Sequence, residues 1–125
     1  MRARSSKGRM AQRGRGTLIF TGATASFRGG PNFASFASAK HALRALAQSM
    51  ARELGPMGVH VGHIIVDGMI DSEAVRSRFP EEAEALPDGG MLDPDHIAEA
   101  YWAMHAQPKD AWTFEMDIRP SVERW

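Results

Sequence analysis

The feature that most constrains the fold is the run Val59–Val66 (VHVGHIIV), which is almost continuously apolar and β-branched. A strand of this composition is covered on both faces, as in the centre of a parallel sheet. A second apolar run, Thr17–Thr21 (TLIFT), lies between two glycines and predicts another buried strand. Trp112–Ile118 alternates apolar with polar residues, which predicts a third strand with one wet face.

A long helix is predicted between the first two strands. From Phe33 to Leu54 apolar residues recur every three or four positions, and Gly55-Pro56 ends the pattern. Seven alanines in this segment leave a surface smooth enough for a second helix to approach closely. We therefore expect a helix over residues 33–54 that contacts both the sheet and a partner.

Shorter elements are predicted after the second strand. Residues 71–79 favour a short helix, and residues 80–92 read as a polar loop long enough to form a flap. Asp93 and Pro94 supply an N-cap and a first-turn proline for a helix that continues through Met104. Alternating strands and helices predict an α/β fold with a parallel sheet of about three strands. Such a sheet is too small to cover its own edges, which indicates part of a larger fold.

Composition narrows the class of protein. The chain has 125 residues, of which 43% are hydrophobic and 24% charged, as in one globular domain. It has no cysteine, which excludes disulfides and thiolate chemistry and fits a cytoplasmic location. No apolar run reaches the roughly 18 to 20 residues of a membrane span, so no membrane association is expected.

The first 15 residues stand apart in charge. They hold six of the 15 Lys and Arg residues and no acidic residue. This composition predicts a basic flexible arm over residues 1–15, ahead of a domain over residues 16–125. Such an arm can bind phosphate backbones, but it lacks the interleaved aromatic residues that stack on bases. A solvated leader is therefore the preferred interpretation, and nucleic acid is not the expected partner.

A family resemblance is carried by the order of segments in GTLIFTGATASFRGGPNFASFASAKHALRALAQSMARELGPMGVHVGHIIVDGMIDS. The strand, loop, lysine-bearing helix, Gly-Pro stop, strand and x-Gly turn resemble the C-terminal half of the short-chain dehydrogenase/reductase superfamily. The resemblance covers residues 16–119. It implies a partial Rossmann-like, doubly wound parallel sheet, NAD or NADP as cofactor, and hydride transfer with a small carbonyl or alcohol substrate.

The chain departs from this family at the catalytic motif. The Tyr-x-x-x-Lys motif reads Phe36-Ala-Ser-Ala-Lys40, so the lysine is present and the phenol is not. By the resemblance, Lys40 would bind the nicotinamide ribose. A phenyl ring cannot exchange a proton with substrate, which removes general acid-base assistance worth roughly 10² to 10⁴ in rate. The family's glycine-rich dinucleotide loop has no counterpart, because the chain contains no Gly-x-Gly-x-x-Gly.

Two further family positions differ. The substrate-orienting serine corresponds to Ala23, and the adjacent Thr24 is a weak candidate to supply a hydroxyl. The cofactor-closing Pro-Gly-x-Val-x-Thr turn corresponds to Asp67-Gly-Met-Ile-Asp-Ser, in which Asp67 puts a negative charge beside the expected cofactor. The resemblance assigns cofactor contacts to Lys40, Gly68, Ile70 and Ser72. An ordinary strand-ending turn is the alternative reading of this segment.

Other candidate groups carry less weight. Tyr101, the only tyrosine, lies in a different predicted helix and is expected to be a packed core aromatic. His60 and His63 are three residues apart on a strand, so their rings face opposite sides and cannot share one metal ion. No metal site is predicted.

These observations support one function and one alternative. The first is a short-chain oxidoreductase homologue that lacks the dinucleotide-binding half and is catalytically impaired as this chain. The alternative is a non-catalytic module that forms a homo-oligomer through the helix of residues 33–54.

Overall fold

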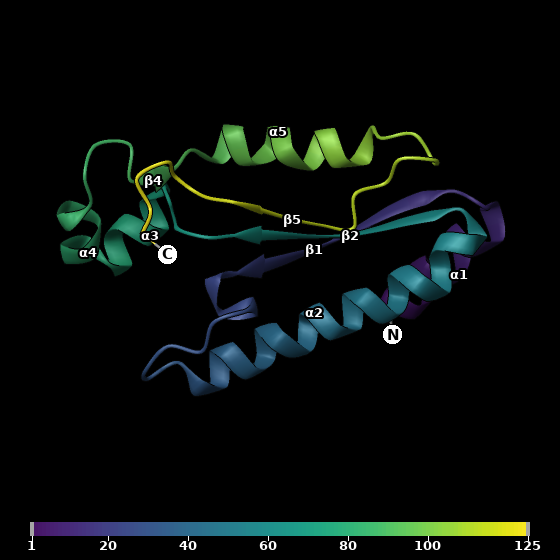
Figure 1. The fold of residues 1–125 in the computed structure, drawn as a ribbon, viewed down its shortest axis with the longest axis horizontal. Coiled ribbons are helices and arrows are strands. Elements are labelled where there is room, and N and C mark those ends of the chain that lie inside the picture. Colours follow the sequence, from purple (N-terminus) through teal and green to yellow (C-terminus); the bar gives the residue numbers. More distant parts are fainter. Residues whose placement is uncertain (1, 125) are drawn as a thin grey trace.

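The computed structural model describes residues 2–124, and their side chains from residue 8 onward, as helices on both sides of a parallel sheet (Figure 1). The strands are β1 (Gly16–Ala23), β2 (Val59–Val66), β3 (Met69–Ile70), β4 (Met91–Leu92) and β5 (Glu115–Ile118). The α-helices are α1 (Arg2–Arg13), α2 (Ala34–Leu54), α3 (Glu73–Arg78), α4 (Pro80–Ala85) and α5 (Pro94–His105). Two 3₁₀ turns, η1 (Thr24–Ser26) and η2 (Gly55–Met57), follow β1 and α2.

The main sheet has the order β1-β2-β5, with all three strands parallel. Strands β1 and β2 pair along their whole length, from Gly16 opposite Val59 to Ala23 opposite Val66. Every residue of β2 is buried, as the apolar run predicts for a central strand. The long helix α2 connects β1 to β2. The predicted α/β class with a partial Rossmann-like sheet is therefore confirmed.

The two faces of the sheet carry separate apolar clusters. On one face Leu54 of α2 packs with Val59 and Val61 of β2. On the other face Met104 of α5 packs with Ile64 and Val66 of the same strand. Figure 1 shows α1 and α2 on one side of the sheet and α5 on the other. The alternation of side chains along β2 thus determines which helix covers which face.

Two glycines allow close packing against these strands. A Cβ added to Gly62 would lie 2.2 Å from Sδ of Met104, so α5 approaches β2 closely at this point. A Cβ added to Gly22 would lie 2.4 Å from Nε2 of His63 and 2.6 Å from Oγ of Ser26. Gly22 therefore makes room for a buried imidazole next to the end of β1.

The N-terminal segment differs from the predicted arm, because residues 2–13 form the helix α1. The physical reason lies at its C-terminal end, where Met10 and Ala11 pack against the cluster of Leu54, Val59 and Val61. The run of basic residues obscured this short apolar contact in the sequence. The sequence analysis did not predict this helix.

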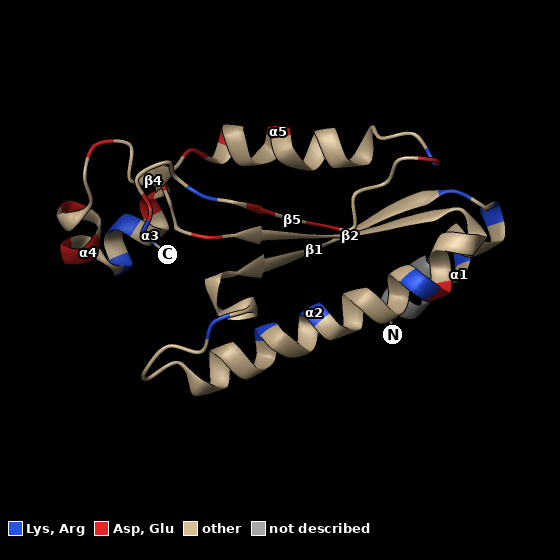
Figure 2. Cartoon of the chain, viewed as in Figure 1, with Lys and Arg blue, Asp and Glu red and all other residues tan. Residues whose placement is uncertain are grey.

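The segment predicted as a polar flap is also more ordered than expected. Pro80 begins α4, and the acidic residues of its first turn favour the positive end of the helix dipole. Figure 2 shows these acidic residues on α4 and basic residues on the neighbouring α3. Met91 and Leu92 form β4, which pairs in parallel with β3. The predicted third strand, in contrast, is shorter than expected and begins at Glu115.

None of the helices formed by residues 2–124 combines the length and apolar character that crossing a bilayer requires.

An ion-pair network connects α2 to the sheet. Arg44 donates to both carboxylate oxygens of Glu115, at 2.9 and 2.8 Å, and Nδ1 of His63 lies 3.0 Å from the same carboxylate. Burial alone would raise the pKa of Glu115, but the hydrogen bonds from Arg44 and His63 outweigh it and hold that pKa below its usual value. The charged form of Glu115 is thus favoured by folding.

This network predicts a pH-dependent contribution to stability. A carboxylate with a lowered pKa in the folded state stabilises the fold above its unfolded-state pKa, and the contribution is lost as pH falls through the folded-state pKa. We expect Glu115→Gln to lower the free energy of unfolding by about 1 kcal/mol at neutral pH. The difference from wild type should shrink below about pH 4. Urea unfolding across this range measures both effects.

Glu84→Gln on the exposed surface of α4 is the matched control, and it should leave the pH profile unchanged. A Glu115→Gln deficit of equal size at all pH values would contradict the role given to the ionised carboxylate.

Candidate functional site

A pocket of about 730 Å³ opens where β1 and β2 end. The carboxyl ends of parallel strands meet at one edge of a sheet, and residues that follow them share one site there. The polar side chains that follow β1 and line the pocket are Thr24 and Arg28. Its apolar wall is formed by Phe33, Phe36, Met69 and Leu86.

Asp67 lies behind this pocket with none of its surface exposed. Nη2 of Arg28 donates to both carboxylate oxygens of Asp67, at 3.1 and 2.9 Å. The hydroxyl of Thr24 donates to Oδ1 at 2.5 Å. Nε of Arg119 lies 3.8 Å from Oδ2 and adds a second positive charge. A buried carboxylate is costly unless it is paired and hydrogen-bonded, and here it is both.

Phe36 and Lys40 lie on one face of α2, as their spacing predicts. Nζ of Lys40 is 5.7 Å from the centre of the Phe36 ring and donates to the carbonyl of Thr21 at 3.2 Å. Phe36 is 48% exposed and lines the pocket, so the ring occupies a position open to a ligand. The geometry of the family motif is thus present, and the phenol is absent.

The hydroxyl of Thr24, the polar candidate next to Ala23, is already hydrogen-bonded within the protein. Ala23 ends β1 and lines the pocket, but its methyl group offers no hydrogen bond. Thr24 is also at the pocket wall, with its hydroxyl committed to Asp67. The loop therefore brings Thr24 to the site and uses its proton to hold the carboxylate.

The residues of the turn after β2 have different surroundings, and only some of them line the pocket. Gly68 lines the pocket with φ at +151°, and a Cβ there would lie 3.0 Å from Pro120. Ile70 pairs in β3 and packs against the core on the α5 side. The Ser72 hydroxyl caps α3 by accepting from the amide of Val75 at 3.2 Å. Of these three expected cofactor contacts, the structure brings only Gly68 to the pocket.

Arg28 is the site residue that the sequence analysis missed. It follows β1 in a loop without periodicity, so no local pattern marked it. The available signal was topological, since Asp67 follows the adjacent strand β2. A buried acid at one strand end calls for a partner from the neighbouring strand end.

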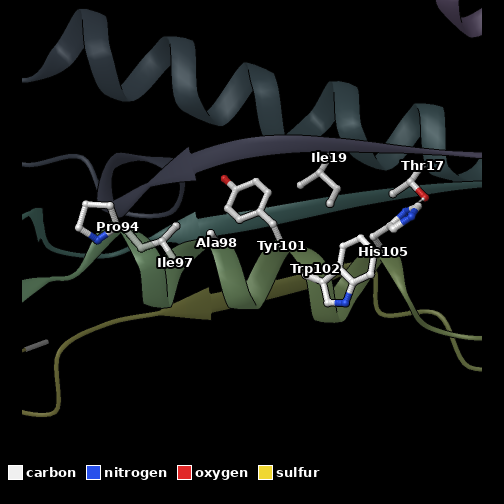
Figure 3. Close-up of a pocket in the computed structure, with 8 residues that line it drawn as sticks. All are labelled: Thr17, Ile19, Pro94, Ile97, Ala98, Tyr101, Trp102 and His105. Carbon is white, nitrogen blue, oxygen red and sulfur yellow. Dashed lines mark hydrogen bonds between the residues drawn. The ribbon is translucent and has the colours of Figure 1, made fainter.

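A second pocket, of about 600 Å³, lies between α5 and β1 on the other side of the sheet. Figure 3 shows the Tyr101 ring directed from α5 toward β1, and its hydroxyl lies 2.5 Å from Oγ1 of Thr21. The ring packs with the core cluster on this face, as expected for a packed aromatic. Because α5 and α2 cover opposite faces, Tyr101 does not take the place of a phenol at position 36.

The two histidines of β2 face opposite sides of the sheet. His60 stacks on Trp112, with ring centres 4.7 Å apart, and its Nε2 is 2.8 Å from the carbonyl of Thr113. His63 faces α2 and pairs with Glu115. Within the part of the chain that the structure describes, no three acidic, histidine or cysteine side chains are placed to hold one metal ion.

Comparison with known proteins identifies the family. The sequence model described as short chain dehydrogenase matches residues 3–83, and the chain belongs to this family. The chain is 31% identical to the 3-oxoacyl-[acyl-carrier-protein] reductase FabG of Vibrio cholerae over 107 residues, covering 82% of this chain and 43% of that protein.

Solved structures agree with this assignment. A short-chain dehydrogenase from Rhodopseudomonas palustris is 48% identical, with a TM-score of 0.70 over 94% of this chain and 44% of that one. A serine dehydrogenase in complex with NADP+ is 20% identical and shows the shared fold alone, with a TM-score of 0.84 over 98% of this chain and 51% of that one. The chain thus spans about half or less of each of these three proteins.

The residues present do not fit a complete dinucleotide. Lys40 lies beside Phe36 of the pocket wall, but the sequence contains no glycine-rich phosphate-loop motif. Ser72 is used as a helix cap, and Thr24 is bound to Asp67. Of the residues expected to contact a cofactor, Gly68 lines the pocket and Lys40 lies beside Phe36.

The proximity of Lys40 makes a direct prediction about position 36. In the variant Phe36→Tyr the introduced phenol should have a pKa below its ordinary value, because a nearby ammonium favours the phenolate. An ultraviolet pH titration measures this, with Lys40→Met added to the same variant to remove the charge. The matched control is Phe33→Tyr, which places a phenol on the same pocket wall just before α2. If the two phenols had the same pKa, the claim that the Lys40 ammonium acts on a group at position 36 would be refuted.

Proposed function

We propose that this chain, by itself, is a short-chain oxidoreductase homologue that does not catalyse hydride transfer. The observation that carries the proposal is the Phe36 ring, which faces the pocket 5.7 Å from Lys40 at the position of the family's proton donor. No proton can pass from this ring to a carbonyl oxygen. The engaged Thr24 hydroxyl supports the same conclusion, because it is held by Asp67.

The family relationship supports the rest of the assignment. Hydride transfer between NAD or NADP and a small carbonyl or alcohol substrate is the activity that an intact site of this kind would perform. Lys40 would then contact the ribose, and Gly68 would border the nicotinamide. The lack of cysteine in the 125 residues supports a cytoplasmic location.

A turnover assay tests the proposal. The purified chain is incubated with NADH or NADPH and a panel of ketones and aldehydes, and nicotinamide absorbance is followed over time. We expect no rate above the protein-free blank, because both the proton donor and the phosphate cradle are lacking. Carbonyl reduction at typical enzyme rates of about 1 s⁻¹ or more would overturn the proposal. An intact short-chain dehydrogenase, assayed in parallel, verifies the conditions.

The exposed face of α2 supports a second candidate function, that of an oligomerisation module. Leu46 is 49% exposed near the middle of the helix, and Phe36 lies exposed nearer its start. Small alanine side chains between them allow a second helix to approach. A homo-oligomer through residues 33–54 would bury this surface.

This candidate predicts a change in oligomeric state. Leu46→Glu places a charge in the middle of the proposed interface and should convert an oligomer to monomer at tens of micromolar protein in analytical ultracentrifugation. Met57→Glu is the matched control, because Met57 is also 49% exposed but lies outside α2. If the wild-type chain sediments as a monomer, the proposed oligomerisation through residues 33–54 is refuted.

A further inference from the structure

Hydride transfer does not need the charged side chain of Arg28, which lies in the pocket wall. Arg28 lines the pocket, and 37% of its side-chain surface is exposed. Its Nη2 makes both bonds to Asp67, so one nitrogen of the guanidinium is used for the ion pair. The Phe27 ring, 5.1 Å from the guanidinium carbon, supports the group from a second side. Arg28 is therefore held in a fixed orientation beside the cavity.

At this end of the sheet the guanidinium of Arg28 lines the pocket, and its counter-ion Asp67 does not. Two guanidinium groups, of Arg28 and Arg119, face the single buried carboxylate of Asp67. Arg119 is in turn paired with Asp117, whose side chain is 40% exposed to solvent. Glu123 and Arg124 add one charge of each sign to the pocket lining. Arg28 and Arg119 are thus offset by Asp67 and Asp117, and Arg28 is the one of these four groups that lines the pocket.

The remaining walls are apolar. Phe33 and Phe36 approach from the start of α2, and Met69 and Leu86 lie across the cavity. A volume of about 730 Å³ lies within the range of small-molecule sites, roughly 300 to 1,000 Å³. A ligand that matches these walls has an aromatic or aliphatic body and one anionic end.

We propose that this pocket binds a monocarboxylate with an apolar body, and that Arg28 donates the hydrogen bonds that recognise its carboxylate. Binding requires no dinucleotide. Asp67 is a positioning residue, because it orients the guanidinium without touching the ligand. The inference rests on the same pocket as the proposed function, but it concerns binding and does not depend on the absence of turnover.

A titration of the full chain with matched probes tests this. Phenylpropionate is compared with phenylpropanamide, which has the same body and no charge, by following backbone amide signals in NMR spectra. We expect saturable shifts at Ala25 and Gly68 with the carboxylate, and an affinity at least about tenfold weaker for the amide. Equal affinities, or no saturation with the carboxylate, would overturn the proposal.

Paired variants identify the residue responsible. Arg28→Gln combined with Asp67→Asn removes both charges together, so no unpaired charge is left buried. Preference for the carboxylate should disappear in this double variant. Arg76→Gln combined with Asp71→Asn makes the same changes in an exposed ion pair and should retain the preference. Retention in the first variant, once its NMR spectrum shows that it is folded, would refute the role of Arg28.

The two proposals fail in separable ways. Nicotinamide turnover by the wild-type chain would remove the proposed function and leave the carboxylate titration to be judged alone. The comparison of the two probes on wild-type protein also decides the matter when the double variant does not fold.

Discussion

A single carboxylate without solvent exposure, that of Asp67, is the constraint around which one end of this molecule is arranged. Asp67 directly follows the central strand β2. Its backbone amide donates to the carbonyl of Ile118, at the end of the paired segment of β2 and β5. Its side chain holds Thr24 and Arg28 from the turn after β1. A buried charge left unpaired would cost several kcal/mol, so both strand ends must be in place together. The position of the pocket depends on this requirement.

The scaffold was predictable from sequence because its signals are periodic and local. The apolar run of β2, the repeat along α2 and the cap of α5 by Asp93 each define an element without reference to distant residues. Helix α1 was not predicted, because its stability depends on a tertiary contact of Met10 that composition does not express. The order within residues 80–92 likewise depends on the pairing of β4 with β3.

In the pocket, too, positions set by local spacing could be predicted and contacts between distant residues could not. Positions 36 and 40 could be placed together from their helical spacing alone, and the structure puts Phe36 in the pocket wall with Nζ of Lys40 5.7 Å from its ring. The pairing of Arg28 with Asp67 joins residues that are 39 positions apart, and it depends on the path of an irregular loop. The assignment of Ser72 to cofactor binding followed from the family resemblance, and the structure uses its hydroxyl to cap α3. The family resemblance therefore predicted where the pocket lies better than it predicted the hydrogen bonds of the residues around it.

Strand β1 is one of the two edge strands of the main sheet formed by residues 2–124. Its eight residues, GTLIFTGA, include no charged side chain and no proline, which are the usual means of protecting a sheet border. The outward-facing peptide groups form a template onto which another extended segment can add. This unprotected border is therefore where the polypeptide is most exposed to association through β pairing.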